Sequence, residues 1–132
     1  MAIYPHMKTG EAEIWERFLR QLPWKAERIE YDVRLGEGAK LPDDVPAWVR
    51  AMAWSLSTKR VDAVVEAADA IYLCEVKDRA SLSAVGQLIG YATLYRMQFA
   101  PVKPLRMVCV CREVAPDMAP IFETQGIQVF VV

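Results

Sequence analysis

Two apolar runs in the middle of this 132-residue chain do most to limit the folds that it can adopt. Residues 61–66 and 71–77 are rich in β-branched side chains, and the four residues between them, 67–70, are typical of a tight connection. The two runs therefore predict a β-hairpin. Because apolar side chains occupy both faces of each run, we expect two central strands in a sheet that is covered on both sides.

The spacing of the other apolar residues predicts the remaining elements and their order. The expected elements are a helix over 10–22 capped by Thr9, a strand over 30–35, the hairpin strands 61–66 and 71–77, a helix from 81 or 83 to 98, a strand over 105–111, a short helix over 116–125 and a strand over 127–132. Residues 36–58 form a loop-rich insert, in which 48–56 has no clear type. Strands joined by helices predict a single α/β domain over 1–132, with a mixed central sheet flanked by helices.

The charge balance narrows the classes of partner. Lys and Arg number 16 and Asp and Glu number 17, so the chain lacks the overall positive charge that drives non-specific binding to nucleic acid. A polyanion would have to be bound by a local cluster of basic residues. The first residues do not resemble a signal peptide, and no apolar run approaches the roughly 20 residues of a membrane span. We therefore expect a cytoplasmic protein that does not enter a membrane.

Cysteine and histidine chemistry is limited by the small number of these residues. Cys74, Cys109 and Cys111 lie inside apolar runs, where free cysteine behaves as a small apolar residue. The chain has neither the even cysteine count of a disulfide scaffold nor a second Cys or His pair at zinc spacing. The single histidine, His6, stands beside Pro5 near the start, and we expect it to be an exposed terminal residue without a catalytic role.

Three ionisable residues interrupt the predicted hairpin. With the turn centred between residues 68 and 69, Asp62 lies directly opposite Glu75, and Lys77 points to the same face as Glu75. Two carboxylates in this position repel each other unless a cation lies between them. Mg²⁺ would suit the site, with the Val76 carbonyl as a further ligand, and metal-assisted phosphodiester hydrolysis is the reaction that fits. The alternative is a structural salt bridge between Lys77 and the two acids.

These residues resemble the signature of a known nuclease superfamily. Asp62, followed after the hairpin by Glu75-Val76-Lys77, resembles the D…(D/E)-x-K signature of the PD-(D/E)xK, or restriction-endonuclease-like, superfamily, whose αβββαβ core matches the predicted order of elements. The resemblance implies a Mg²⁺- or Mn²⁺-dependent nuclease that hydrolyses phosphodiester bonds, with DNA as partner and without an organic cofactor. It implies a catalytic role for Asp62, Glu75 and Lys77, in repair, recombination or phage DNA processing.

A second motif is similar to one branch of that superfamily. Gln87 and Tyr91, four residues apart on the predicted helix 81–98, resemble the Q-x-x-x-Y element of RecB-like nucleases. The resemblance implies that both support the active site or contact the DNA backbone. Residues four apart share a helix face and can act together. Without the resemblance, a polar residue beside a core aromatic is the more common interpretation.

The superfamily often carries a further glutamate on its first helix. Of Glu11, Glu13 and Glu16, only Glu11 points in the direction of the apolar face of the predicted helix 10–22. We therefore expect Glu11 at the metal; the alternative is an acidic residue that interacts favourably with the helix dipole. The predicted metal ligands are Glu11, Asp62, Glu75 and the carbonyl of Val76.

Basic and aromatic residues near the predicted site could contact a nucleic acid. The candidate phosphate contacts are Lys59, Arg60, Arg79 and Arg96, with an ordinary solvated surface as the alternative. In the insert, Trp48 and Trp54 with Arg50 could stack unpaired bases, although core or interface packing is the more common role of such tryptophans.

The sequence also departs from the superfamily in two respects. Val61 stands before Asp62 where many members have proline, and the N-terminal histidine motif and four-cysteine cluster of larger RecB-like members are missing. These departures predict a minimal stand-alone nuclease, which could still act with a partner protein or as a homodimer. The rival interpretation is a non-catalytic module with the nuclease fold that serves a DNA-processing complex.

Overall fold

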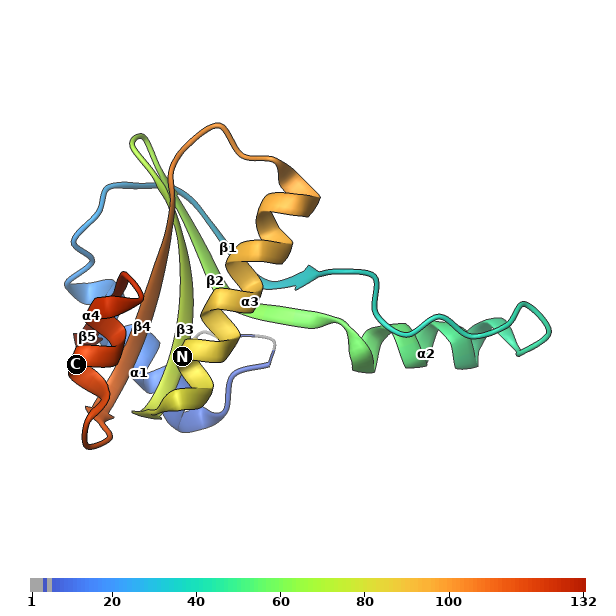
Figure 1. Cartoon of the computed structure of the whole chain (residues 1–132), viewed down its shortest axis with the longest axis horizontal. Helices are drawn as coiled ribbons and strands as arrows, with labels where there is room; N and C mark the ends of the chain where they lie inside the picture. The colour runs from blue at the N-terminus through green and yellow to red at the C-terminus, as the bar shows by residue number, and fades with distance from the viewer. Residues whose placement is uncertain (1–3, 5) are drawn as a thin grey trace.

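The computed structural model describes Tyr4 and residues 6–132, which form one mixed sheet with helices on both faces (Figure 1). The elements in chain order are α1 (Thr9–Arg20), β1 (Ala26–Leu35), α2 (Ala47–Ser57), β2 (Lys59–Ala67), β3 (Ile71–Ala80), α3 (Leu82–Phe99), β4 (Leu105–Val114), α4 (Met118–Thr124) and β5 (Ile127–Val131). The predicted α/β fold class, with a mixed sheet flanked by helices, is confirmed.

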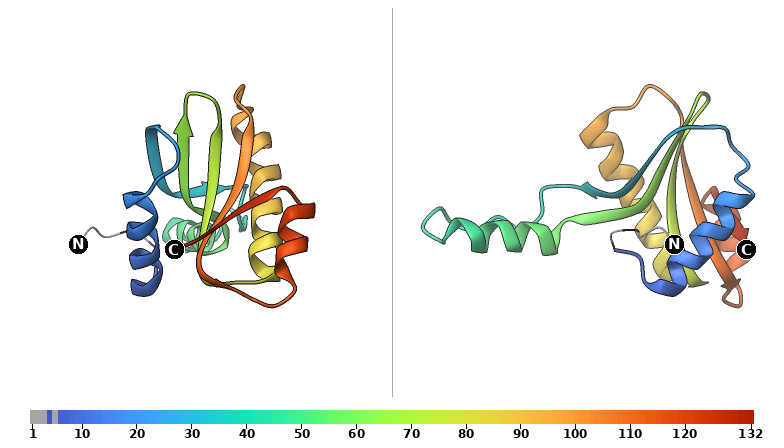
Figure 2. Two further views of the ribbon diagram at one scale, coloured as in Figure 1. Left: turned by 90° about the vertical axis from the view of Figure 1, so that its left-hand side faces the viewer. Right: turned by 180° about the vertical axis from the view of Figure 1, so that it is seen from behind.

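The five strands lie in the sheet in the order in which they occur in the chain. β1, β2 and β3 pair antiparallel, with residues 36–58 between β1 and β2 and a tight turn between β2 and β3. β3, β4 and β5 pair parallel and are joined by α3 and α4. Parallel neighbours need a crossover, and a helix supplies it. α1 covers one face of the sheet, and α3 and α4 cover the other (Figure 2). The central strands β2 and β3 are buried along most of their length, as the apolar runs predicted.

The core on the α1 face follows the predicted helical spacing. Ile14, Trp15 and Phe18 are fully buried against apolar residues of β2, β3 and β4. Trp15 Nε1 donates a hydrogen bond to the hydroxyl of Tyr31 on β1 at 3.0 Å, so the buried indole N–H has a partner. This packing fixes α1 on the sheet and leaves the opposite face to α3.

Several predicted boundaries were wrong by a few residues. Thr9 is the first residue of α1 and not its cap, because Lys8 occupies that position. The first strand begins at Ala26 rather than residue 30, since its pairing with β2 extends to Ala67. Residues 48–56, for which the sequence indicated no type, lie within α2.

The insert between β1 and β2 forms an arm that extends away from the body of the molecule (Figure 1). We use "arm" for residues 36–58, which include α2. The structure describes every residue of α2, and none of them is buried.

Within the described part of the chain, no helix is long and apolar enough to cross a lipid bilayer.

Candidate functional site

The hairpin of β2 and β3 brings the predicted acids together where the two strands separate. Their backbone pairing runs from Glu66 with Ile71 to Ala63 with Cys74, which confirms the predicted register. One step beyond this ladder, the backbone N–H of Val76 donates to Asp62 Oδ2 at 2.8 Å. The Asp62 carboxylate therefore lies between the strands and is held beside the backbone of the predicted motif.

Glu75 and Lys77 meet Asp62 at this point. Glu75 is 4% exposed and Asp62 7% exposed, which is unusual for carboxylates. Lys77 Nζ lies 3.5 Å from Glu75 Oε2, so part of the negative charge is balanced. Glu75 Oε1 is buried and has no hydrogen-bond partner among the residues that the structure describes. The structure thus brings together the two acids and the lysine, while their catalytic roles stay a prediction.

The surroundings of Glu75 favour its protonated form. The pKa of Glu75 is raised to about 9, and burial is the main cause. The charge of Asp62 and a hydrogen bond with Asp62 raise the pKa further, whereas the charge of Lys77 lowers it. Burial also raises the pKa of Tyr91, and the charges of Glu75 and Asp62 raise it further. At neutral pH and without a bound cation, Glu75 therefore holds a proton, and the Tyr91 hydroxyl keeps its own.

α3 places the second motif next to these acids. Gln87 and Tyr91 line a pocket of about 330 Å³ together with Lys59 of β2. Gly86 and Gly90 also line it, and a Cβ atom added to either would meet nothing within 4 Å, so this side of the helix is open. Gln87 Oε1 is buried without a hydrogen-bond partner in the described part of the chain. Of the four predicted basic contacts, Lys59 is the one that shares this pocket.

The prediction that His6 is an exposed terminal residue was wrong. Its side chain is 20% exposed, Nε2 contacts Asp62 Oδ1, and Nδ1 lies 3.0 Å from Asp32 Oδ1. The hydrogen bond to Asp62 is the main cause that raises the pKa of His6; the charges of Asp62 and Asp32 add to it, and burial and Arg60 oppose it. Tyr4, two residues before His6, is anchored to α1 because its hydroxyl donates to Glu16 Oε1 at 2.8 Å. A histidine therefore does accompany the acids.

Asp32 is a site residue that the sequence reasoning missed. It lies on β1 between the pairs Tyr31 with Ala63 and Val33 with Val61, which places it opposite Asp62. Its backbone φ is +53°, a conformation that aspartate tolerates better than most residues. Arg60 Nη1 lies 3.8 Å from Asp32 Oδ1. A charged residue inside a predicted strand was the available signal, as it was for Asp62.

Among the described residues, no hydrogen bond or ion pair connects Glu11 with Asp62 or Glu75. Glu11 Oε1 accepts a hydrogen bond from the backbone N–H of Lys8 at 3.1 Å, as a residue in the first turn of a helix often does. α1 packs on the sheet face to which Val76 points. Glu75 and Lys77 alternate with Val76 along β3, so their side chains point to the opposite face, which α3 covers. Its role as a metal ligand stays a prediction.

The remaining basic candidates lie around the site and not in it. Arg79 Nε is 3.9 Å from Glu113 Oε1, and both side chains are largely exposed. Arg96 is exposed near the end of α3.

Among the described residues, no group of three or more His, Cys, Asp or Glu side chains has the geometry of a formed metal site. The described acids therefore do not by themselves form a complete ligand shell.

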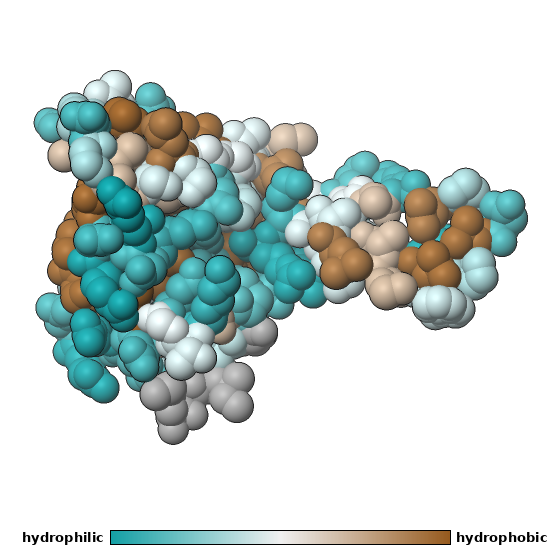
Figure 3. All heavy atoms as spheres, turned by 90° about the horizontal axis from the view of Figure 1, so that it is seen from below, coloured by the Kyte–Doolittle hydropathy of each residue, from teal (hydrophilic) through white to brown (hydrophobic). Residues whose placement is uncertain are grey.

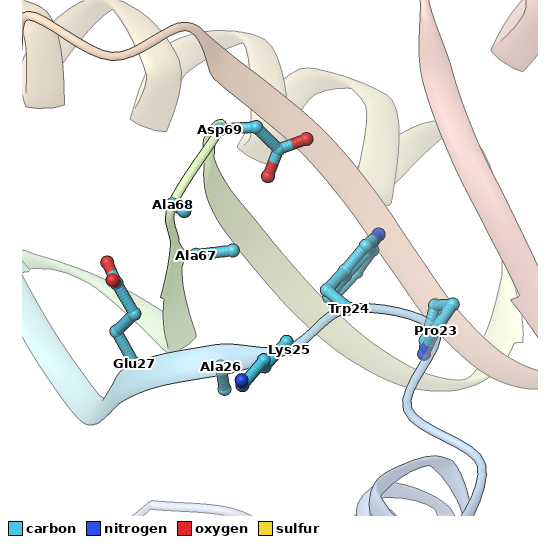
Figure 4. A pocket seen from close by; sticks show the side chains of 8 residues that line it. All are labelled: Pro23, Trp24, Lys25, Ala26, Glu27, Ala67, Ala68 and Asp69. Atoms are coloured by element: carbon cyan, nitrogen blue, oxygen red, sulfur yellow. The ribbon is translucent and has the colours of Figure 1, made fainter.

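A larger pocket lies at the opposite end of the β2–β3 hairpin. It measures about 600 Å³ and is lined by Trp24 and residues of the turn, including Asp69 (Figure 4). Trp24 stacks on Tyr72 with ring centroids 3.7 Å apart. Glu75, whose pKa is strongly raised, lies at the other end of the strands, so size alone does not identify the functional site.

Comparison with known proteins tests the fold. No family model and no curated protein matches the chain. The crystal structure of a repair endonuclease from Pyrococcus abyssi matches it with a TM-score of 0.55 and 15% identity, over 100% of this chain and 49% of that one. The structure of an EndoMS–dsDNA complex matches with a TM-score of 0.52 and 17% identity, over 100% and 48%.

The chain has an endonuclease fold. At these identities the likeness concerns the fold alone, and the chain spans about half the length of either neighbour. One neighbour is a repair endonuclease and the other is in complex with double-stranded DNA, and these properties belong to the neighbours. The α/β fold predicted from the sequence is thus shared with two solved structures.

Proposed function

We propose that this chain is a metal-dependent nuclease that hydrolyses phosphodiester bonds in DNA. The observation that carries the proposal is the meeting of Asp62, Glu75 and Lys77 at the point where β2 and β3 separate. The fold, shared with two endonuclease structures, supports the same conclusion. We further propose that it belongs with the RecB-like branch of the PD-(D/E)xK superfamily, on the strength of Gln87 and Tyr91.

The donor set fits a hard divalent cation. Two buried carboxylates, Asp62 and Glu75, belong to one site, Glu75 Oε1 has no hydrogen-bond partner among the described residues, and Lys77 Nζ lies 3.5 Å from Glu75 Oε2. Such oxygen ligands are those that Mg²⁺ and Mn²⁺ prefer. We assign Asp62, Glu75 and the Val76 carbonyl as ligands and retain Glu11 as a further one. A bound ion of this kind activates water and stabilises charge on the phosphate.

The other residues of the site would position the substrate and balance its charge. The Lys77 ammonium group, held beside Glu75, can neutralise negative charge that develops on the phosphate. Tyr91 keeps its proton and can donate a hydrogen bond, and Gln87 has a free amide oxygen. We assign phosphate contacts to Lys59 in the adjoining pocket and to Arg60, Arg79 and Arg96 around it.

A cleavage assay tests the proposal. Linear, nicked, branched and single-stranded DNA are incubated with Mn²⁺ and either the wild-type chain or the Lys77→Met variant. We expect the variant to lose roughly 100-fold or more in cleavage rate, as is typical when one charge-stabilising group is removed. Lys40→Met is the matched control, because Lys40 is an exposed lysine that pairs only with Glu37 on the arm. Cleavage that is equal in wild type and Lys77→Met indicates a contaminating nuclease.

Calorimetric titration with Mn²⁺ separates the rival interpretations. The nuclease and a metal-binding module both predict binding that is lost in Asp62→Ala and Glu75→Ala. A chain that binds the ion but cuts none of the DNA forms supports the non-catalytic module. A wild-type chain that binds no metal supports a structural salt bridge and refutes the proposal.

A further inference from the structure

The arm, residues 36–58, presents a helix face that nothing in the described chain covers. Trp48 is 69% exposed, Met52 47% and Leu56 74%, and the three lie at successive four-residue intervals on α2. In Figure 3 apolar side chains gather along the arm, which extends from the body. Exposed apolar clusters of this kind mark interaction sites in soluble proteins.

The opposite side of α2 is occupied by the arm's own loop. Arg50 Nε donates to the carbonyl of Val45 at 3.0 Å, and Ser57 Oγ accepts a hydrogen bond from the backbone N–H of Ala39 at 2.5 Å. Arg50 also lies 3.8 Å from Asp43. The loop thus fixes one face of the helix, and the face with Trp48 is turned outward.

The chemistry of the outward face argues against a polyanion as its partner. It carries no charged residue, and the only charged residue of α2, Arg50, is directed to the loop. The arm as a whole has the acids Glu37, Asp43 and Asp44 against the bases Lys40 and Arg50. Nucleic acid and anionic lipid surfaces are bound through basic residues, which this face does not offer. Base stacking by Trp48 and Trp54 beside Arg50 is therefore disfavoured.

Two rows of side chains give the outward face a shape that complements itself. One row is small and the other is large, and each follows the four-residue ridge of the helix. The small row is Ala47, Ala51 and Ser55, and the large row is Trp48, Met52 and Leu56. When two such helices pack antiparallel, each large side chain of one helix can lie against a small one of the other.

We propose that α2 is a dimerisation helix, which pairs antiparallel with α2 of a second copy of this chain about a two-fold axis between Ala51 and Met52. In this register Trp48 faces the partner's Ser55, Met52 the partner's Ala51 and Leu56 the partner's Ala47. A two-fold interface of this kind is made by the same surface on both copies. Interfaces between copies of one chain are also the most apolar class, which agrees with the uncharged face.

The expected affinity follows from the size of the contact. Each copy contributes six residues of α2, whereas a standard interface uses about 20–30 residues on each side. We therefore expect a dissociation constant in the micromolar range. The acids of the candidate active site lie on β2 and β3 and not on α2. The inference consequently does not rest on the proposed nuclease function.

Sedimentation equilibrium tests the pairing on the full chain between about 5 and 200 µM, a range that brackets the expected affinity. We expect the wild type to dimerise and Met52→Glu and Met52→Lys to weaken dimerisation by more than about tenfold, because like charges meet near the axis. An equimolar mixture of these two variants should dimerise again, since opposite charges then face each other. Val102→Glu is the control, because Val102 is fully exposed outside the arm.

The mixture distinguishes pairing from simple damage to the helix. Restored dimerisation in the mixture shows that both variants keep α2 folded and that residue 52 lies near the two-fold axis, close to the same residue of the partner. A wild-type chain that stays monomeric throughout the range overturns the proposal. So does a dimer that Met52→Glu leaves intact, or a pair of variants that remains monomeric when mixed.

Discussion

The substitution Glu75→Gln should stabilise the metal-free chain at neutral and alkaline pH. Burial and the neighbouring Asp62 raise the pKa of Glu75 from 4.5 to about 9. Between these values the folded chain holds a proton on Glu75 that the unfolded chain has lost. The free energy of unfolding of the wild type therefore falls as the pH rises through this window. Glutamine has a similar shape and does not ionise, so it avoids this loss.

The size of the effect follows from proton linkage. A difference of one proton between the folded and unfolded states changes the free energy of unfolding by up to about 1.4 kcal/mol for each pH unit. The advantage of Glu75→Gln over the wild type should thus grow by up to about 3 kcal/mol between pH 6 and pH 8. Near pH 5 the two chains should differ little, because both carry a neutral side chain at position 75.

Urea denaturation in the presence of EDTA at several pH values measures this difference. Glu66→Gln serves as the control, because Glu66 lies on β2, is partly exposed and pairs with Lys103 at 3.9 Å. With Mn²⁺ at about 100 times its dissociation constant, the wild type should gain about 2.7 kcal/mol, and Glu75→Gln should gain much less. A stability difference that does not change with pH, or a variant less stable than the wild type at pH 8, would refute the reasoning.

Three further substitutions test the packing and the backbone. Trp15→Ala should lower the free energy of unfolding by about 3–5 kcal/mol in urea denaturation, because the indole is fully buried and bonded to Tyr31; a loss below about 1 kcal/mol would contradict this packing. Gly86→Ala should raise stability by about 0.5–1 kcal/mol, since Gly86 lies inside α3 with open space around it. Gly126→Ala meets equally open space but has a φ of +69°, so it should instead destabilise by about 1 kcal/mol; equal thermal shifts would disprove the assignment to backbone conformation.

The hairpin of the candidate site could be predicted because its geometry is local. The turn at residues 67–70 sets which residues of β2 and β3 face each other, and the two-residue period of a strand places Lys77 on the face of Glu75. The helix face with Gln87 and Tyr91 follows in the same way from a four-residue spacing. Interactions between residues near in sequence are thus sufficient to bring Asp62, Glu75 and Lys77 together.

The arm was only partly predictable. Its glycines and prolines indicated an insert, but whether Trp48 packs inside or remains exposed depends on where the insert points. That direction is set by the β1–β2 pairing, which continues to Leu35 and Lys59 before α2 begins. Apolar composition alone favoured packing within the chain, and the structure leaves the face uncovered.

The sequence by itself determined the mixed sheet, the hairpin register and the convergence of Asp62 with Glu75, because each depends on short-range periodicity and turn position. Tertiary structure alone decided that His6 lies between Asp32 and Asp62, because a terminal segment has no pattern of its own and is placed by contacts with residues far along the chain. It also decided the pKa of Glu75, since burial and the nearness of other charges exist only once the sheet and α3 have packed.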